Sequence, residues 1–155
     1  MINLVYLIGA IAVFLADRFS KVRVISIAEA GETFAEIGNA FSFTYVRNSG
    51  AAFSMLSGRL GFLSVFSIAF CIGVIVYWFV KKPTNKLLCS SLAMMAAGAL
   101  GNTVDRIMYG YVVDFIKTEF INFPVFNIAD IAITVGAALM VISVCLEDRK
   151  NGDKK

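Results

Sequence analysis

Four long apolar stretches constrain what this chain can fold into. They cover about residues 2–23, 60–80, 87–108 and 128–146. A helix of about 20 mostly apolar residues is long enough to cross the hydrocarbon core of a bilayer. Because lipid offers the backbone no hydrogen-bonding partners, a long apolar segment that crosses a membrane satisfies its own N–H and C=O groups as a helix. The sequence therefore predicts four transmembrane helices.

The composition favours the same membrane location. Of the 155 residues, 59% are hydrophobic and only 16% are charged, whereas soluble domains average about 45–50% and about 25%. A soluble domain of this length could not bury so many apolar side chains, because a small domain keeps a large surface for its volume. We expect one integral-membrane domain over residues 1–155. Its basic residues lie in short groups, so nucleic acid is not an expected partner.

The segments between the apolar stretches differ in character. Residues 81–86 form a short basic turn, whereas residues 24–58 are long and mixed. Within the long segment, residues 40–46 alternate apolar and polar side chains, which is typical of a strand. The predicted fold is an all-α membrane protein with a small β-rich element, on the membrane surface, between the first two spans.

The orientation in the membrane is left open by the charges. Four spans place both termini on one side, and the 14 Lys and Arg residues divide equally between the two sides. The positive-inside rule therefore does not decide. The compact basic turn and the basic tail favour cytoplasmic termini, but only weakly.

The absence of histidine excludes several kinds of catalysis. Ser-His-Asp and Cys-His mechanisms and HExxH metalloproteases all need that residue. The three cysteines lie inside apolar runs without CxxC spacing, so we interpret them as small buried or lipid-facing side chains. Any catalysis must use carboxylates, lysine, serine or cysteine.

Two aspartates near the ends of the apolar stretches have basic neighbours in the sequence. Lys21 follows Asp17 by four residues, on the same face of a helix, and Arg106 directly follows Asp105. Ionisable groups at membrane depth are costly, so each needs a reason to be there. For these two aspartates the local bases favour structural ion pairs.

Two further aspartates, Asp114 and Asp130, lie in apolar surroundings without an adjacent base. Burial raises the pKa of a carboxyl, and two close carboxylates share one proton. That state suits an aspartic peptidase, in which one carboxylate activates water and the protonated partner polarises the scissile carbonyl. The chain between them can fold back to one membrane face. Two separate acids at helix ends would fit the same residues, so both interpretations stay open here.

Three asparagines could serve these aspartates or a substrate. Asn48, Asn102 and Asn127 can donate amide hydrogen bonds to a carboxylate or to a substrate carbonyl. Asparagine is also common in turns and helix caps, so a purely structural role is the alternative.

Five short motifs follow one another in a fixed order. They are residues 17–21 (DRFSK), 47–53 (RNSGAAF), 98–106 (GALGNTVDR), 112–115 (VVDF) and 126–130 (FNIAD). Together they resemble the lipoprotein signal peptidase family, also called signal peptidase II, and the resemblance covers nearly the whole chain. The departures are small: Arg18 stands where the family often has Gln, and Ser20 where Thr is more common.

The resemblance implies an aspartyl endopeptidase that cuts diacylglyceryl-modified bacterial prolipoproteins just before the lipidated cysteine. It implies that Asp114 and Asp130 are the catalytic pair. The other matching positions are implied to bind substrate or to support the pair: Asp17, Lys21, Asn48, Gly50, Asn102, Asp105, Arg106, Asn127 and Ala129.

The resemblance also implies a location and a set of partners. The active site would face the outer side of the bacterial inner membrane, with both termini in the cytoplasm. Lipidated prolipoproteins and membrane lipids would be the partners of a monomeric enzyme. No metal and no cofactor are expected.

Two other interpretations compete with a peptidase of this kind. A non-enzymatic membrane protein, such as a transporter subunit or a scaffold, would explain the apolar stretches but not the unpaired aspartates. An intramembrane serine or metal-dependent protease would be a different enzyme, and the missing histidines argue against the metal-dependent kind.

Overall fold

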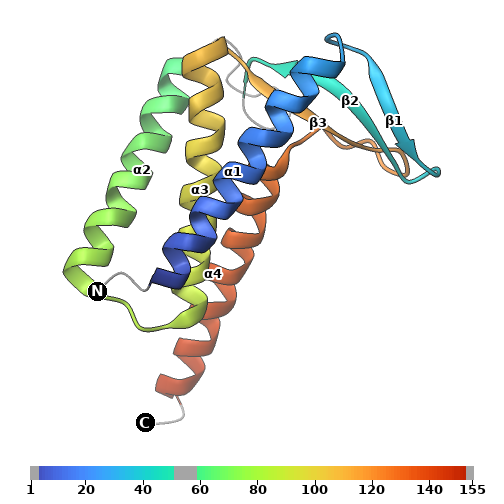
Figure 1. Ribbon diagram of the computed structural model, residues 1–155. Helices are drawn as coiled ribbons and strands as arrows, with labels where there is room; N and C mark the ends of the chain where they lie inside the picture. Colours follow the sequence, from blue (N-terminus) through green and yellow to red (C-terminus); the bar gives the residue numbers. More distant parts are fainter. Residues whose placement is uncertain (1–3, 51–58, 153–155) are drawn as a thin grey trace.

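Four helices form most of the computed structural model, which describes residues 4–50 and 59–152 (Figure 1). They are α1 (Leu4–Ile27), α2 (Leu60–Lys81), α3 (Lys86–Tyr109) and α4 (Ile128–Gly152). At about 1.5 Å per residue, each is longer than the roughly 30 Å hydrocarbon core of a bilayer. Helix α3 lies in the middle and contacts the other three. Helix α1 begins and α4 ends at the same end of the bundle.

Three of these helices, α2, α3 and α4, are long and apolar enough to cross a membrane. The described part of α1 is as long, but its second half carries Asp17, Arg18 and Lys21. The prediction of several membrane-spanning helices is therefore confirmed for three. The fourth span stays a prediction.

The exposed surface of α2 is strongly apolar. Phe62, Val65, Phe66 and Phe79 are each more than 60% exposed. Soluble monomers rarely expose a continuous apolar surface of this kind, so lipid is its natural environment.

Local sequence chemistry ends and starts the helices that flank the basic turn. Lys82, just after α2, adopts a left-handed conformation with φ 46°, and Pro83 follows. Asn85 then caps α3, because its side-chain oxygen accepts the backbone N–H groups of Leu87 and Leu88 at 2.9 and 3.2 Å. Gly110 ends α3 at φ 73°, a conformation that glycine adopts without steric cost.

A three-stranded antiparallel sheet projects from the other end of the bundle (Figure 1). Its strands are β1 (Thr33–Ile37), β2 (Phe41–Asn48) and β3 (Val112–Thr118), in the order β1-β2-β3. The sheet packs on the end of α1 through a core of Val24, Tyr45, Val113 and Phe115.

The sheet both confirms and corrects the sequence prediction. The strand predicted over residues 40–46 is present as β2. The β-rich element predicted between the first two spans is present as β1 and β2, but the prediction is incomplete, because β3 joins the sheet from the segment between α3 and α4. Pairing of β2 with β3 places Val46 opposite Asp114 and Asn48 opposite Val112. The third strand thus brings the VVDF motif beside Asn48.

Glycines let the helices approach each other closely near this end. A Cβ on Gly98 of α3 would collide with the backbone oxygen of Ala129, and one on Gly101 would collide with the carboxylate of Asp17. Farther along α4, a Cβ on Gly136 would lie 2.6 Å from Met95 Cγ. Helix α3 therefore packs closely against both α1 and α4.

Candidate active site

Asp114 and Asp130 meet at the junction of β3 and α4, and Asn127 bridges them. The side-chain Nδ2 of Asn127 donates to Asp114 Oδ1 at 2.7 Å. Its backbone N–H donates to Asp130 Oδ2 at 3.1 Å. One residue therefore fixes the position of both carboxyls relative to each other.

Two more asparagines bind the remaining oxygens of the pair. Asn48 Nδ2 donates to Asp114 Oδ2 at 2.9 Å. Asn102 Nδ2 donates to Asp130 Oδ1 at 2.8 Å. Each of the four carboxyl oxygens thus accepts one N–H, and because a carboxylate oxygen has two lone pairs, each keeps one for other partners.

The orientation of each asparagine amide is fixed by a donor on its far side. Asn102 Oδ1 accepts a hydrogen bond from Lys21 Nζ at 2.8 Å. Asn48 Oδ1 accepts one from the backbone N–H of Gly50 at 2.9 Å. Asn127 Oδ1 accepts one, also at 2.9 Å, from the backbone N–H of the third residue of α4. With their oxygens occupied in this way, all three amides present NH₂ groups to the carboxyl pair.

The spacing of the FNIAD motif has a structural cause. Asn127 stands at the N-cap of α4 and Asp130 three residues later, and each side chain accepts the other's backbone N–H. This is the reciprocal arrangement of a capping box. The same two side chains therefore cap the helix and form part of the site. Asn127 thus has both roles considered from the sequence: it caps α4 and it binds a carboxylate.

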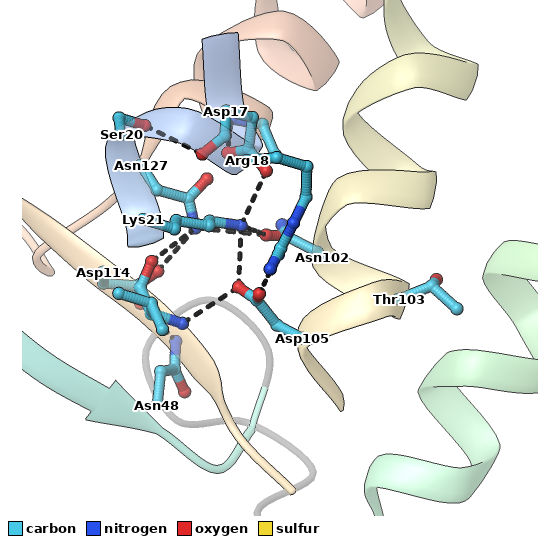
Figure 2. A network of polar contacts seen from close by, with 12 residues as sticks. Asp17, Arg18, Ser20, Lys21, Asn48, Asn102, Thr103, Asp105, Asp114 and Asn127 are labelled. Carbon is cyan, nitrogen blue, oxygen red and sulfur yellow. Dashed lines mark hydrogen bonds and ion pairs between the residues drawn. The ribbon is translucent and has the colours of Figure 1, made fainter. Parts of the chain in front are cut away.

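A second, fully buried cluster supports the pair from behind, with Lys21 at its centre (Figure 2). Lys21 Nζ lies 3.0 Å from Asp17 Oδ2 and 2.9 Å from Asp105 Oδ2, in addition to its bond to Asn102. The ammonium group thus contacts two carboxylates and one amide oxygen. The predicted Asp17–Lys21 ion pair is confirmed.

This cluster ties separate elements together through backbone groups. Asp17 Oδ1 accepts the N–H of Ala129 at 2.9 Å, which joins α1 to the first turn of α4. A carboxylate is favourable there, because the N-terminal end of a helix carries partial positive charge. Asp105 Oδ2 accepts the N–H of Val113 at 3.2 Å, which joins α3 to β3.

The predicted ion pair between Asp105 and Arg106 is wrong. Asp105 instead binds Lys21 and the guanidinium of Arg18. Consecutive residues on a helix project in different directions, so the side chains of Asp105 and Arg106 do not face each other. Arg106 lines a cavity instead, and its buried Nε has no hydrogen-bond partner in the described structure.

The cavity in front of the pair has a volume of about 510 Å³. Asp114, Asp130 and Arg106 line it together with mostly apolar side chains, and Ser67 of α2 stands among its lining residues. An apolar chamber with a few converging polar groups is typical of a substrate site.

Burial and the nearby charge of Asp130 raise the pKa of Asp114 to about 7, against opposing hydrogen bonds from Asn48 and Asn127. Asp114 lies on β3, outside the membrane-spanning helices. At neutral pH it therefore exchanges its proton readily, as a general acid or base should.

Every site residue predicted from the motifs lies in this region, and two contributors were missed. Arg18 binds Asp105. Its position next to Asp17, in the charged second half of α1, was the sequence signal that could have identified it. Gly101 leaves room for the Asp17 carboxylate, which a Cβ at this position would meet. The sequence signal for it was the glycine directly before Asn102. Residues 51–53 of the second motif lie outside the described residues.

The comparison with protein families decides what kind of protein carries this site. The family model described as Signal peptidase (SPase) II matches residues 9–146. The chain belongs to the signal peptidase II family. The resemblance drawn from the five motifs is confirmed, and as a family member the protein is a protease with membrane-spanning helices.

Individual relatives agree with this assignment. The chain is 38% identical to the lipoprotein signal peptidase of Latilactobacillus sakei over 97% of its own length and 99% of that protein. It is 45% identical to the lipoprotein signal peptidase of Pseudoalteromonas translucida, over 90% and 87% of the two chains. A bacterial membrane enzyme solved by the in meso method at 2.3 Å superposes with a TM-score of 0.91, at 32% identity over 99% of this chain and 94% of the other.

Proposed function

We propose that this protein is an aspartyl endopeptidase that removes the signal peptide of diacylglyceryl-modified bacterial prolipoproteins just before the lipidated cysteine. Family membership supports the substrate class. The observation that carries the aspartyl mechanism is the bridge made by Asn127, which holds Asp114 and Asp130 at one cavity.

In the proposed reaction the pair carries one proton. The ionised carboxylate takes a proton from a water molecule as its oxygen attacks the scissile carbonyl carbon. The protonated carboxyl donates a hydrogen bond to the carbonyl oxygen, and a proton then passes to the leaving nitrogen as the peptide bond breaks. The raised pKa of Asp114 supports this residue as the proton carrier.

The other matching residues hold this machinery in place. Asn48, Asn102 and Asn127 fix the carboxyl rotamers, and Gly50 fixes Asn48. A buried cluster behind the asparagines supports them in turn. It consists of Asp17, Lys21, Asp105 and the backbone of Ala129. Such support keeps reacting groups within the small tolerance that catalysis requires.

The lipid on the substrate would act by positioning the scissile bond. Apolar contacts alone discriminate poorly among signal peptides, because lipid tails are as apolar as leucine. Acyl chains anchored in the membrane would instead hold the bond at the depth of Asp114 and Asp130, which is a proximity effect. The mostly apolar cavity beside the pair supports this account.

We further propose that residues 1–155 form one domain with four spans, α1 included, and act as a monomer in the inner membrane. The basic α2–α3 turn, with Lys81, Lys82 and Lys86, lies at the end where α1 begins and α4 ends (Figure 1). The positive-inside rule favours that end as cytoplasmic. The sheet and the aspartate pair would then face the outer side.

The test is incubation of the purified protein with one prolipoprotein, with and without prior lipidation. We expect a single cut before the lipidated cysteine, located by mass spectrometry, that chelators and serine-directed reagents leave unaffected. Equal cleavage of both forms would contradict the role given to the lipid. Inhibition by a chelator would favour a metal-dependent protease instead.

A further inference from the structure

Arg106 is a partly buried cation that the mechanism above leaves without a role. It lies in α3 and lines the same cavity as Asp114 and Asp130. Its Nε is buried and, among the described residues, has no hydrogen-bond partner. A charged group kept from water without full pairing is costly. The site must therefore gain something from a positive charge at this place.

A count of the charges around the site suggests the role of this positive charge. The carboxylates of Asp17 and Asp105 are balanced by two cations, Lys21 and Arg18, through direct ion pairs. Among the described residues, that leaves Arg106 and the Asp114–Asp130 pair as the charged groups that line the cavity. With both carboxyls ionised, this remainder carries one net negative charge. With one proton on the pair, the remainder is neutral.

Carboxylates on three elements act on the charge of Arg106. Asp130 of α4 acts most strongly on its charge, followed by Asp114 of β3 and Asp105 of α3. Lys21 on α1 also acts on both members of the pair, and on Asp130 more strongly than Arg106 does. Its charge, however, is shared with two other carboxylates, those of Asp17 and Asp105. The cavity residue from α2, Ser67, is uncharged.

We propose that Arg106 is the counter-charge of the singly ionised Asp114–Asp130 pair, and that it holds the pair at one proton over the working pH range. This inference rests on the proposed function. Arg106 is thus a positioning residue that acts through the pair. A cation beside two carboxyls favours their ionised forms, so both proton-binding steps occur at lower pH than they would without it.

The test compares Arg106→Gln, which removes the charge, with Arg106→Lys, which keeps it. The readout is the pH dependence of kcat/KM on a lipidated prolipoprotein. We expect both limbs of the bell-shaped profile to move to higher pH in Arg106→Gln, by on the order of one pH unit. The profile of Arg106→Lys should stay near that of the wild type. Arg23→Gln removes the same charge from an exposed position on α1 and should leave the profile unchanged.

A second readout does not depend on turnover. The infrared band of a protonated carboxyl, assigned to the pair by its loss in Asp114→Asn, should persist to higher pH in Arg106→Gln than in the wild type. If Arg106→Gln does not fold, Arg106→Met serves the same purpose in this apolar cavity, with the same expected shift.

Two results would overturn the inference. One is lower activity of Arg106→Gln with an unmoved pH profile and infrared titration, which would give Arg106 a role in binding or packing only. The other is an equal shift in Arg106→Gln and Arg106→Lys, which would show that charge is not the cause. Substantial activity in either Asp114→Asn or Asp130→Asn would instead contradict the proposed function itself.

Discussion

Asp17 accepts the backbone N–H of Ala129 at 2.9 Å, across 112 residues of sequence. This bond places the first turn of α4, and with it Asp130, against the middle of α1. The same carboxylate neutralises the buried Lys21 at 3.0 Å. One side chain therefore links the helix that carries half of the aspartate pair to the charge cluster behind it.

We predict that Asp17→Ala destabilises the protein strongly. The substitution leaves the Ala129 N–H unsatisfied and takes one of two carboxylates from Lys21, and breaking a buried ion pair costs about 3–5 kcal/mol. Asp17→Asn keeps an acceptor oxygen and should lose less. Thermal unfolding in detergent measures both variants. Wild-type stability of Asp17→Ala would show that this link is not structural.

Gly101 provides a sharper test of the packing around Asp17. A Cβ at this position would collide with the Asp17 carboxylate, so Gly101→Ala should cost about 1–3 kcal/mol and reduce activity. Gly73→Ala in α2 is the matched control, because a Cβ there meets nothing within 4 Å. In an open helical position alanine is favoured over glycine, so the control should be neutral or slightly stabilising. Equal stability of the two variants would contradict the close approach of α1 and α3.

The raised pKa of Asp114 predicts a trade-off between activity and stability. Its pKa is about 7 in the folded protein and 3.8 in the absence of perturbation, so protonated Asp114 favours folding. This contribution is complete below about pH 4 and is lost as the pH rises toward 7 and above. Asp114→Asn cannot ionise, so we expect it to unfold at a higher temperature than the wild type at pH 8.

The advantage of Asp114→Asn should be on the order of a few kcal/mol at pH 8 and should vanish near pH 4. Thermal unfolding of both proteins across this range measures it. Asp148→Asn, at an exposed position near the end of α4, should follow the wild type at every pH. A constant difference between Asp114→Asn and the wild type would rule out titration of Asp114 as the cause.

The sequence predicted features that depend on local spacing. The apolar stretches match α2 and α3 closely and the start of α4, but α4 continues to Gly152, beyond the predicted end at residue 146. The Asp17–Lys21 pair follows from their four-residue separation on one helix. Alternation of apolar and polar side chains marked β2 as a strand. It did not predict which residues are buried, because the register shifts between Phe43 and Val46, and Ser42 and Tyr45 are the buried ones.

Features set by distant partners were predicted less well. Strand β3 was missed, although Val112, Val113 and Ile116 are good strand formers. Its partner β2 lies more than 60 residues earlier, and nothing local announces that pairing. The wrong partner predicted for Asp105 has a related cause. Arg106 is next in sequence, whereas Arg18, which binds Asp105, is 87 residues away.

The most direct test of the aspartate pair is cleavage of a lipidated prolipoprotein by Asp114→Asn and Asp130→Asn. Asparagine keeps the size and hydrogen bonding of aspartate but cannot take up or release the catalytic proton. We predict that each variant is folded and membrane-inserted yet cleaves no substrate above background, while Asp148→Asn cleaves at the wild-type rate. Substantial turnover by either pair variant would contradict the account.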